Sequence, residues 1–132
     1  MIYSPLQFLY WYDRPTAFTS ESAGMEWFRH LPTVWDDTKV LGGRPGEFVA
    51  IARRKGEQWF VGTITSNEGR EVRLPLEMLT PGGRYVADLY VDGDGPRDVQ
   101  RERRSVARGD TIVLTLLPRG GAAVRLTPET RR

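Results

Sequence analysis

The hydrophobic and polar positions follow two different periods along the chain. Before about residue 31 the apolar side chains recur at helical spacing, whereas from Gly46 onward short apolar runs alternate with turn-forming residues. The later runs are rich in valine, isoleucine, leucine and aromatic residues, which is typical of strands. In chain order they are EFVAIARR, QWFVGTIT, EVRLPLEML, RYVADLYV, TIVLTLL and AAVRLT. Six such runs at hairpin spacing predict an antiparallel β-sandwich.

Alternation within these runs gives each predicted strand one inward face. In RYVADLYV, Tyr85, Ala87 and Leu89 share one face, and Asp88 lies on the other. The run TIVLTLL alternates in the same way. Between the first two runs, the segment KGE predicts a tight hairpin turn at Gly56.

Two short helices are predicted ahead of the strands. Ser4 can cap a helix whose first residue is a proline, and Gln7 can reach back to its start, so a helix is predicted from Pro5 to about Tyr12. Its apolar side chains surround the axis, which is typical of a helix buried inside a larger body. A second short helix is predicted from about Ala23 to His30 and is ended by Pro32.

The stretch PTVWDDTKVL, residues 32–41, lies where the period changes. Trp35, Asp36 and Asp37 are candidates for contacting a carbohydrate. Consecutive side chains diverge, so the two aspartates do not suit the paired carboxyl groups that flank a glycosidic bond. A single cation or a pair of sugar hydroxyls would suit them better. The structural alternative is an Asx turn at the aspartates, with Trp35 packed between two elements.

Composition limits the kinds of site that this chain can carry. Its 132 residues are enough for one domain with a real core, and the absence of cysteine excludes disulfides, thiolate metal sites and a cysteine nucleophile. The net charge of +2 does not demand nucleic acid as a partner. The apolar N-terminal stretch has no basic region and is too short to span a bilayer, so we expect neither a signal peptide nor a membrane partner, and localisation stays open.

Three further motifs have mainly structural interpretations. The arginine-rich run RDVQRERRSVAR predicts a solvated loop or an edge strand, with phosphate binding as the alternative. The single histidine, His30, has no serine, cysteine or metal-ligand spacing around it, which favours a helix-end or surface role. The turn DGDG lacks the remaining oxygens of a calcium loop. We therefore expect no metal site in this chain.

In order along the chain, several segments resemble the final stretch of glycoside hydrolase family 97, bacterial enzymes that act on α-glucosides or α-galactosides. These segments are YSPLQFLYWYDRP, PTVWDDTKVLGGRPGEFVAIARRKGEQWFVGTIT, REVRLPLEML, RYVADLYVDG and PRGGAAVRL. The most specific of them is PGEFVAIARRKGEQWFVGTIT. Such enzymes have an N-terminal β-sandwich, a catalytic (β/α)8 barrel and a C-terminal β-sandwich described as an oligomerisation module.

The resemblance implies a mainly β fold, an antiparallel sandwich of about six to eight strands preceded by one or two short helices left from the end of a (β/α)8 barrel. Residues 1–40 would be the barrel remnant and linker, and residues 41–132 the C-terminal sandwich. The family's catalytic carboxylates and calcium ligands lie upstream of the matched stretch, so none is carried over. The chain alone is therefore expected to have no catalytic residue, no cofactor and no glycosidase activity, and the full-length family is expected to be periplasmic or secreted.

The expected role is packing against a parent barrel or against another copy of the chain. Such a fragment would expose the apolar side chains of its N-terminal part, and these are the candidates for self-association: Leu6, Phe8, Leu9, Trp11, Trp27 and Phe28. One alternative is a carbohydrate-binding module that stacks a sugar on Trp35, Trp59 or Tyr90. Another is a subunit that completes a barrel supplied by a separate chain.

Overall fold

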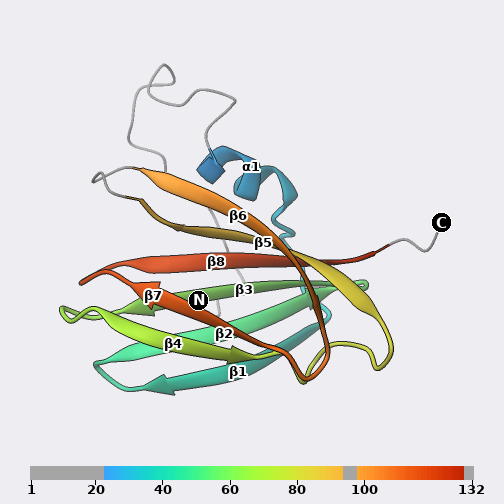
Figure 1. The fold of residues 1–132 in the computed structure, drawn as a ribbon, viewed down its shortest axis with the longest axis horizontal. Coiled ribbons are helices and arrows are strands. Elements are labelled where there is room, and N and C mark those ends of the chain that lie inside the picture. Colours follow the sequence, from blue (N-terminus) through green and yellow to red (C-terminus); the bar gives the residue numbers. More distant parts are fainter. Residues whose placement is uncertain (1–22, 94–97, 130–132) are drawn as a thin grey trace.

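The computed structural model describes residues 23–93 and 98–129. One helix, α1 (Ala23–His30), precedes eight strands in these residues (Figure 1). The strands are β1 (Asp37–Arg44), β2 (Phe48–Lys55), β3 (Gln58–Thr65), β4 (Arg70–Pro75), β5 (Arg84–Asp92), β6 (Val99–Ala107), β7 (Thr111–Leu116) and β8 (Gly121–Pro128). The second predicted helix is confirmed, and the helix predicted from Pro5 to about Tyr12 lies outside the described residues.

The strands form two antiparallel sheets. The large sheet has the order β1-β2-β3-β8-β5-β6, which can be followed from bottom to top in Figure 1, and the small sheet pairs β4 with β7. All of these pairings are antiparallel. The prediction of a mainly β antiparallel sandwich is confirmed.

The core lies between the two sheets and follows the predicted alternation. On the small sheet, Leu74 pairs with Ile112, and both side chains are at most 1% exposed. On the large sheet, Tyr85, Ala87 and Leu89 of β5 belong to the same core and are also buried. Among the eight described strands, those of the small sheet have no hydrogen-bonded neighbour in the large one. The packing of apolar side chains therefore holds the two layers together.

The first predicted hairpin is confirmed. Lys55 of β2 pairs with Gln58 of β3, which leaves Gly56 and Glu57 as a two-residue turn. Gly56 has a φ of 57°, in the left-handed region that glycine adopts without steric cost.

The glycine-rich segment after residue 41 differs from its prediction. The sequence pattern predicts a turn over residues 42–46, but Gly42, Gly43 and Arg44 belong to β1, and the turn covers residues 45–47. A Cβ on Gly43 would lie 3.1 Å from the carbonyl oxygen of Phe48, so glycine permits the close approach of β1 to β2. The domain boundary predicted after Val40 falls inside β1, and the division into a barrel remnant and a sandwich stays a prediction.

The arginine-rich run forms β6, which pairs with β5 and ends the large sheet. This confirms the edge-strand interpretation. Most of its side chains are exposed, so no apolar alternation marks it as a strand in the sequence.

Candidate functional site on the outer face of the large sheet

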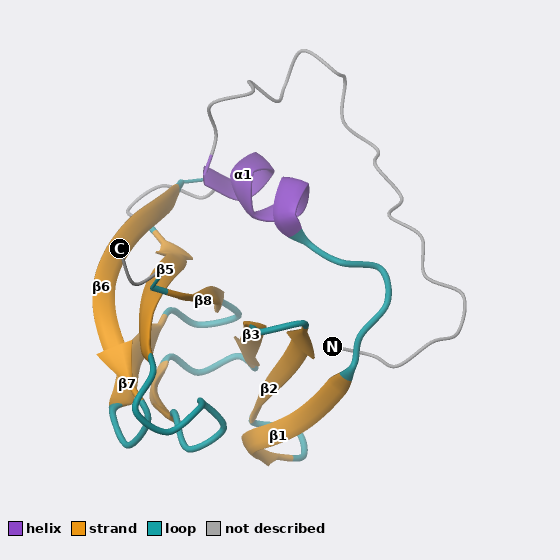
Figure 2. Ribbon diagram, turned by 90° about the vertical axis from the view of Figure 1, so that its right-hand side faces the viewer, coloured by secondary structure: helices purple, strands orange, loops and turns teal. Residues whose placement is uncertain are grey.

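The face of the large sheet that is turned away from β4 and β7, here called the outer face, carries α1 (Figure 2). Residues paired across neighbouring strands point to the same face of a sheet. The register pairs Phe60 with Arg125, Arg125 with Asp88, and Asp88 with Arg103. One row of side chains therefore crosses β3, β8, β5 and β6, and it joins aromatic residues to charged ones.

Aromatic rings fix α1 and the segment after it to this row. The Trp27 ring lies edge-on to Phe60 and Tyr90, with centroid distances of 5.7 and 5.5 Å. The Trp35 ring lies edge-on to Phe60 at 5.4 Å. Phe60 and Tyr90 are 3% and 4% exposed. Such edge-to-face pairs stabilise packing beyond the area they bury, by about 0.5–1.5 kcal/mol each.

Asp88 is the centre of a charge cluster on the same face. Its side chain is buried and accepts hydrogen bonds from three guanidinium groups. Arg101 and Arg103 of β6 donate to Oδ1 at 2.8 Å each, and Arg125 of β8 donates to Oδ2 at 2.9 Å. Burial by itself would raise the pKa of Asp88, but these hydrogen bonds outweigh it and hold the pKa well below its ordinary value of 3.8.

Glu26 extends the cluster to α1. Its carboxylate lies 2.8 Å from Arg101 and 3.8 Å from Arg125, so both arginines bridge the helix and Asp88. The hydrogen bond to Asp88 raises the pKa of Arg101. Burial, with the charge of Arg125 as the next cause, lowers the pKa of His30 at the end of the helix. The helix is therefore tied to the sheet by ion pairs as well as by aromatic packing.

The cluster predicts an acid-dependent loss of stability. Because the pKa of Asp88 is lowered on folding, its charged form stabilises the folded chain above the unfolded pKa of about 3.8, and this contribution is lost as the pH falls below that value. We expect Asp88→Asn to flatten the acid side of the stability profile by up to about 1.4 kcal/mol per pH unit. Urea unfolding between about pH 2 and pH 6 measures this slope. Glu102→Gln is the matched control, and equal slopes in D88N and the wild type would contradict the prediction.

The predicted carbohydrate-contact residues have structural partners. Asp36 accepts hydrogen bonds from the backbone N–H of Gly56 at 2.7 Å and from Lys55 Nζ at 3.1 Å, which lower its pKa. The Asx-turn interpretation is wrong for Asp36, because its carboxylate binds the tip of the β2–β3 hairpin. Asp37 accepts from the N–H of Thr38 at 2.8 Å.

Trp35 is half-buried on the outer face. Beside its contact with Phe60, its ring lies 5.7 Å from the guanidinium carbon of Arg53, and its Nε1 is buried with no hydrogen-bond partner among the described residues. It lines a hollow of about 290 Å³ between the segment after α1 and the sheet. A sugar contact from Trp35, Asp36 or Asp37 stays a prediction.

The other two proposed sugar platforms are not available on the surface. Trp59 and Tyr90 are each 4% exposed. Trp59 faces the core between the sheets, and Tyr90 is covered by Trp27. The carbohydrate-binding alternative would need these rings to be exposed, and neither is, because Trp59 is buried between the sheets and Tyr90 lies under Trp27.

The predicted self-association residues are divided between described and undescribed parts of the chain. Trp27 contacts the chain's own aromatic rings, and Phe28 is 39% exposed. Leu6, Phe8, Leu9 and Trp11 lie outside the described residues. Self-association through this set stays a prediction.

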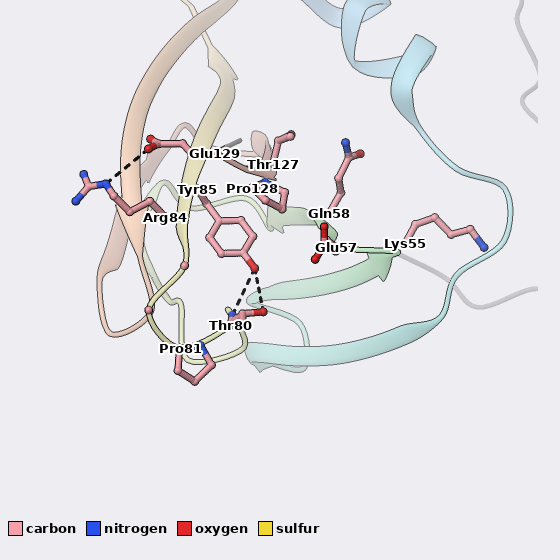
Figure 3. A pocket seen from close by; sticks show the side chains of 12 residues that line it. Lys55, Glu57, Gln58, Thr80, Pro81, Arg84, Tyr85, Thr127, Pro128 and Glu129 are labelled. Carbon is pink, nitrogen blue, oxygen red and sulfur yellow. Dashed lines mark hydrogen bonds and ion pairs between the residues drawn. The ribbon is translucent and has the colours of Figure 1, made fainter. Parts of the chain in front are cut away.

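A wide hollow of about 970 Å³, lined by polar and apolar side chains, lies at one end of the sandwich (Figure 3). It is bounded by the β2–β3 hairpin, the segment before β5 and the end of β8. The Tyr85 hydroxyl points toward Thr80 and donates to its Oγ1 at 3.1 Å, while the buried ring offers no face for stacking a sugar. Arg84 pairs with Glu129 at 3.7 Å. The described residues that line this hollow form no nucleophile–base pair.

The described residues hold neither a cluster of metal ligands nor a membrane-spanning helix. No three histidine, cysteine, aspartate or glutamate side chains in residues 23–93 and 98–129 are grouped so that they could hold a metal ion. In the same part of the chain, no helix has the length and apolar character needed to cross a membrane.

Comparison with known proteins shows the family to which this chain belongs. Residues 34–127 match the family model described as "Glycosyl-hydrolase 97 C-terminal, oligomerisation". The chain belongs to this family. The resemblance seen in the sequence is thereby confirmed, and the match covers the eight described strands up to the last residue but one of β8, but not α1.

Relatives of this glycosyl hydrolase 97 C-terminal domain are much longer proteins. It is 33% identical over 109 residues to a probable retaining α-galactosidase of Streptomyces bingchenggensis, and 32% identical over 118 residues to a retaining α-galactosidase of Bacteroides thetaiotaomicron. The aligned regions are 83% and 86% of this chain but only 16% and 18% of those enzymes. The chain therefore spans less than a fifth of the length of these relatives.

Solved structures agree with this placement. A glycoside hydrolase family 97 enzyme from Pseudoalteromonas sp. strain K8, in complex with acarbose, superposes with a TM-score of 0.75 at 30% identity, over 80% of this chain and 18% of that one. A β-arabinopyranosidase superposes with a TM-score of 0.69 at 26% identity, over 85% and 18% of the two chains.

Sequence reasoning missed Asp88, the most extensively paired side chain among the described residues of this family 97 domain. The available signal was an aspartate in the middle of a strand whose neighbouring positions are apolar. A buried carboxylate needs cationic partners. The nearby arginine-rich run supplies two of them.

Proposed function

We propose that this chain works as the non-catalytic C-terminal domain of a family 97 type α-glycosidase, acting on α-glucosides or α-galactosides, and that its own role is domain packing or oligomerisation. The observation that carries the proposal is the outer face of the large sheet. Part of this face fixes the preceding helix through Asp88 and the aromatic rings. Another part carries exposed apolar side chains such as Val40 and Ile64.

The chemistry of the carboxylates supports a non-catalytic role. Glu26 and Asp88 are brought together by the arginines that they share. Guanidinium groups pair with both carboxylates, and the hydrogen bonds from the arginines lower the pKa of Asp88, whereas a general acid needs a raised one. This arrangement suits a rigid connection between elements.

The purified 132-residue chain is expected to hydrolyse neither a chromogenic α-galactoside nor a chromogenic α-glucoside, because the reacting carboxylates of the parent enzyme would lie elsewhere. It is also expected to show a mass above the 15.0 kDa of one chain in light scattering. A full-length family 97 enzyme serves as the positive control for hydrolysis. Turnover by the chain alone would contradict the non-catalytic role, and a monodisperse monomer over the micromolar range would contradict the oligomerisation role.

A further inference from the structure

Within residues 23–93 and 98–129, the outer face is covered unevenly. The helix α1 contacts β5 and β6, and β1 lies at the other end of the large sheet (Figure 2). On β1, β2 and β3, three aliphatic side chains point outward from this uncovered part: Val40, Val49 and Ile64, here called the apolar strip. Val40 is 71% exposed and Ile64 is 53% exposed, while Val49 pairs with Ile64 across the strands and is half-buried.

The apolar strip borders a hollow of about 520 Å³. The turn over residues 45–47 forms one side of the hollow, and Phe48 and Ser66 also line it. An apolar hollow beside a turn can receive a side chain of a partner protein. Such hollows are typical of the central part of a protein interface.

The rim of the hollow carries charges of both signs. Glu47 lies 3.9 Å from Arg44 and 2.9 Å from Arg70. The Arg44 and Glu47 side chains are 74% and 46% exposed, so both can also reach a partner. In a dimer with a two-fold axis, the same surface of each copy forms the interface. Because this surface carries neighbouring positive and negative side chains, Arg44 of each copy can pair with Glu47 of the other.

Two other routes for joining copies are less favourable. The exposed edge of β6 carries three arginines and one glutamate, Glu102, so two copies that met there would bring an excess of positive charge together. The free edge of β1 is interrupted by a bulge between Val40 and Gly42, which disfavours continuous strand pairing between copies. Packing face to face over the apolar strip avoids both obstacles.

The family match includes this region, as it includes almost the whole sandwich. The model described as an oligomerisation domain covers residues 34–127, which contain the whole apolar strip and its charged rim. It does not cover Trp27 and Phe28, the self-association residues expected on α1. A surface shared by the family would thus lie on the sandwich.

We propose that a second copy of this chain packs on the apolar strip about a two-fold axis, with Val40 and Ile64 at the centre of the interface and Arg44 and Glu47 at its rim. The proposal rests on the proposed function and names the surface that performs it.

Light scattering and sedimentation equilibrium of the full 132-residue chain test the surface. The variants are Val40→Glu and Ile64→Glu, which place charges at the centre of the strip. The control is Val113→Glu, because Val113 is 40% exposed on β7 of the small sheet and lies outside the strip. Circular dichroism verifies that each variant is folded. We expect V40E and I64E to raise the dimer dissociation constant at least tenfold, toward a monomer at micromolar concentration, and V113E to leave it unchanged.

Charge exchange at the rim adds a test that does not depend on the apolar residues. Arg44→Glu and Glu47→Arg are each expected to weaken the dimer. The double variant is expected to recover it in part, because the pairs across the two-fold axis are restored with their signs exchanged. A double variant that is as weak as the sum of the single variants would overturn the assignment of the rim.

The absence of cysteine allows a direct probe of proximity. A chain carrying Val40→Cys is expected to form a disulfide-linked dimer on mild oxidation, whereas a chain carrying Val113→Cys remains unlinked. If the wild type is a dimer and V40E, I64E and V40C behave like the Val113 controls, the proposed surface is wrong while the proposed function stands.

Two further outcomes show whether the oligomerisation role or the proposed interface is at fault. If the wild type is a monomer, the oligomerisation role itself fails. If a longer parent enzyme is monomeric and protects the thiol introduced by Val40→Cys from labelling, the preceding domain covers the strip and the proposal is overturned.

Discussion

Asp88→Asn is expected to lower the free energy of unfolding by about 3 kcal/mol at neutral pH, because breaking a buried ion pair costs roughly 3–5 kcal/mol. The asparagine keeps the shape of the side chain but leaves Arg101, Arg103 and Arg125 without their shared negative charge. The side chains of Arg101 and Arg103 are 32% and 61% exposed and can turn toward water, which places the expected loss at the low end of this range. Urea unfolding followed by tryptophan fluorescence measures it.

The control for this experiment lies on β6. Glu102→Gln removes a carboxylate that is 54% exposed and pairs with Arg104 at 2.8 Å. Exposed ion pairs contribute little, so a change within about 0.5 kcal/mol is expected. If D88N and E102Q were equally stable, the Asp88 cluster would have no role in holding the sheet and α1 together.

Leu74→Ala is the second large change and is expected to cost about 3 kcal/mol, within the range for buried leucines. Leu74 is fully buried on β4. The two sheets share no hydrogen-bonded strands in the part of the chain that the structure describes, so a cavity at this position weakens the apolar contact that joins β4 and β7 to the large sheet. Thermal and urea unfolding both report the loss.

Val113→Ala is the matched control for the core variant. Val113 lies on β7 beside Ile112, which pairs with Leu74, but it points outward and is 40% exposed. Truncation there is expected to change stability by less than about 0.5 kcal/mol. A loss in V113A comparable with that in L74A would mean that strand propensity, rather than packing between the layers, dominates the small sheet.

The sandwich could be predicted because its strands alternate strictly. Tyr85, Ala87 and Leu89 on β5 follow the inward period of two, and the same pattern places Ile112 and Leu114 of β7 in the core. By contrast, the sequence pattern does not mark β1 as a strand, since its alternation is interrupted by the bulge after Val40 and by two glycines.

The outer face could not be predicted from the same alternation. A period of two divides a strand into an inner and an outer side, but it cannot tell which part of the outer side another element covers. Asp88 is buried on the outer side of β5, and the three arginines that bind it lie 13, 15 and 37 residues away along the chain. That arrangement depends on the strand order, which places β5 between β8 and β6.

The segment between α1 and β1 is fastened at both ends. Trp27 and Glu26 hold the helix, while Trp35 packs on Phe60 and Asp36 binds the hairpin tip at Gly56. With both of its ends fixed in this way, the segment between α1 and β1 does not act as a flexible hinge. The helix α1 is therefore held in one orientation relative to the sandwich, so a force applied to α1 would be transmitted to the large sheet.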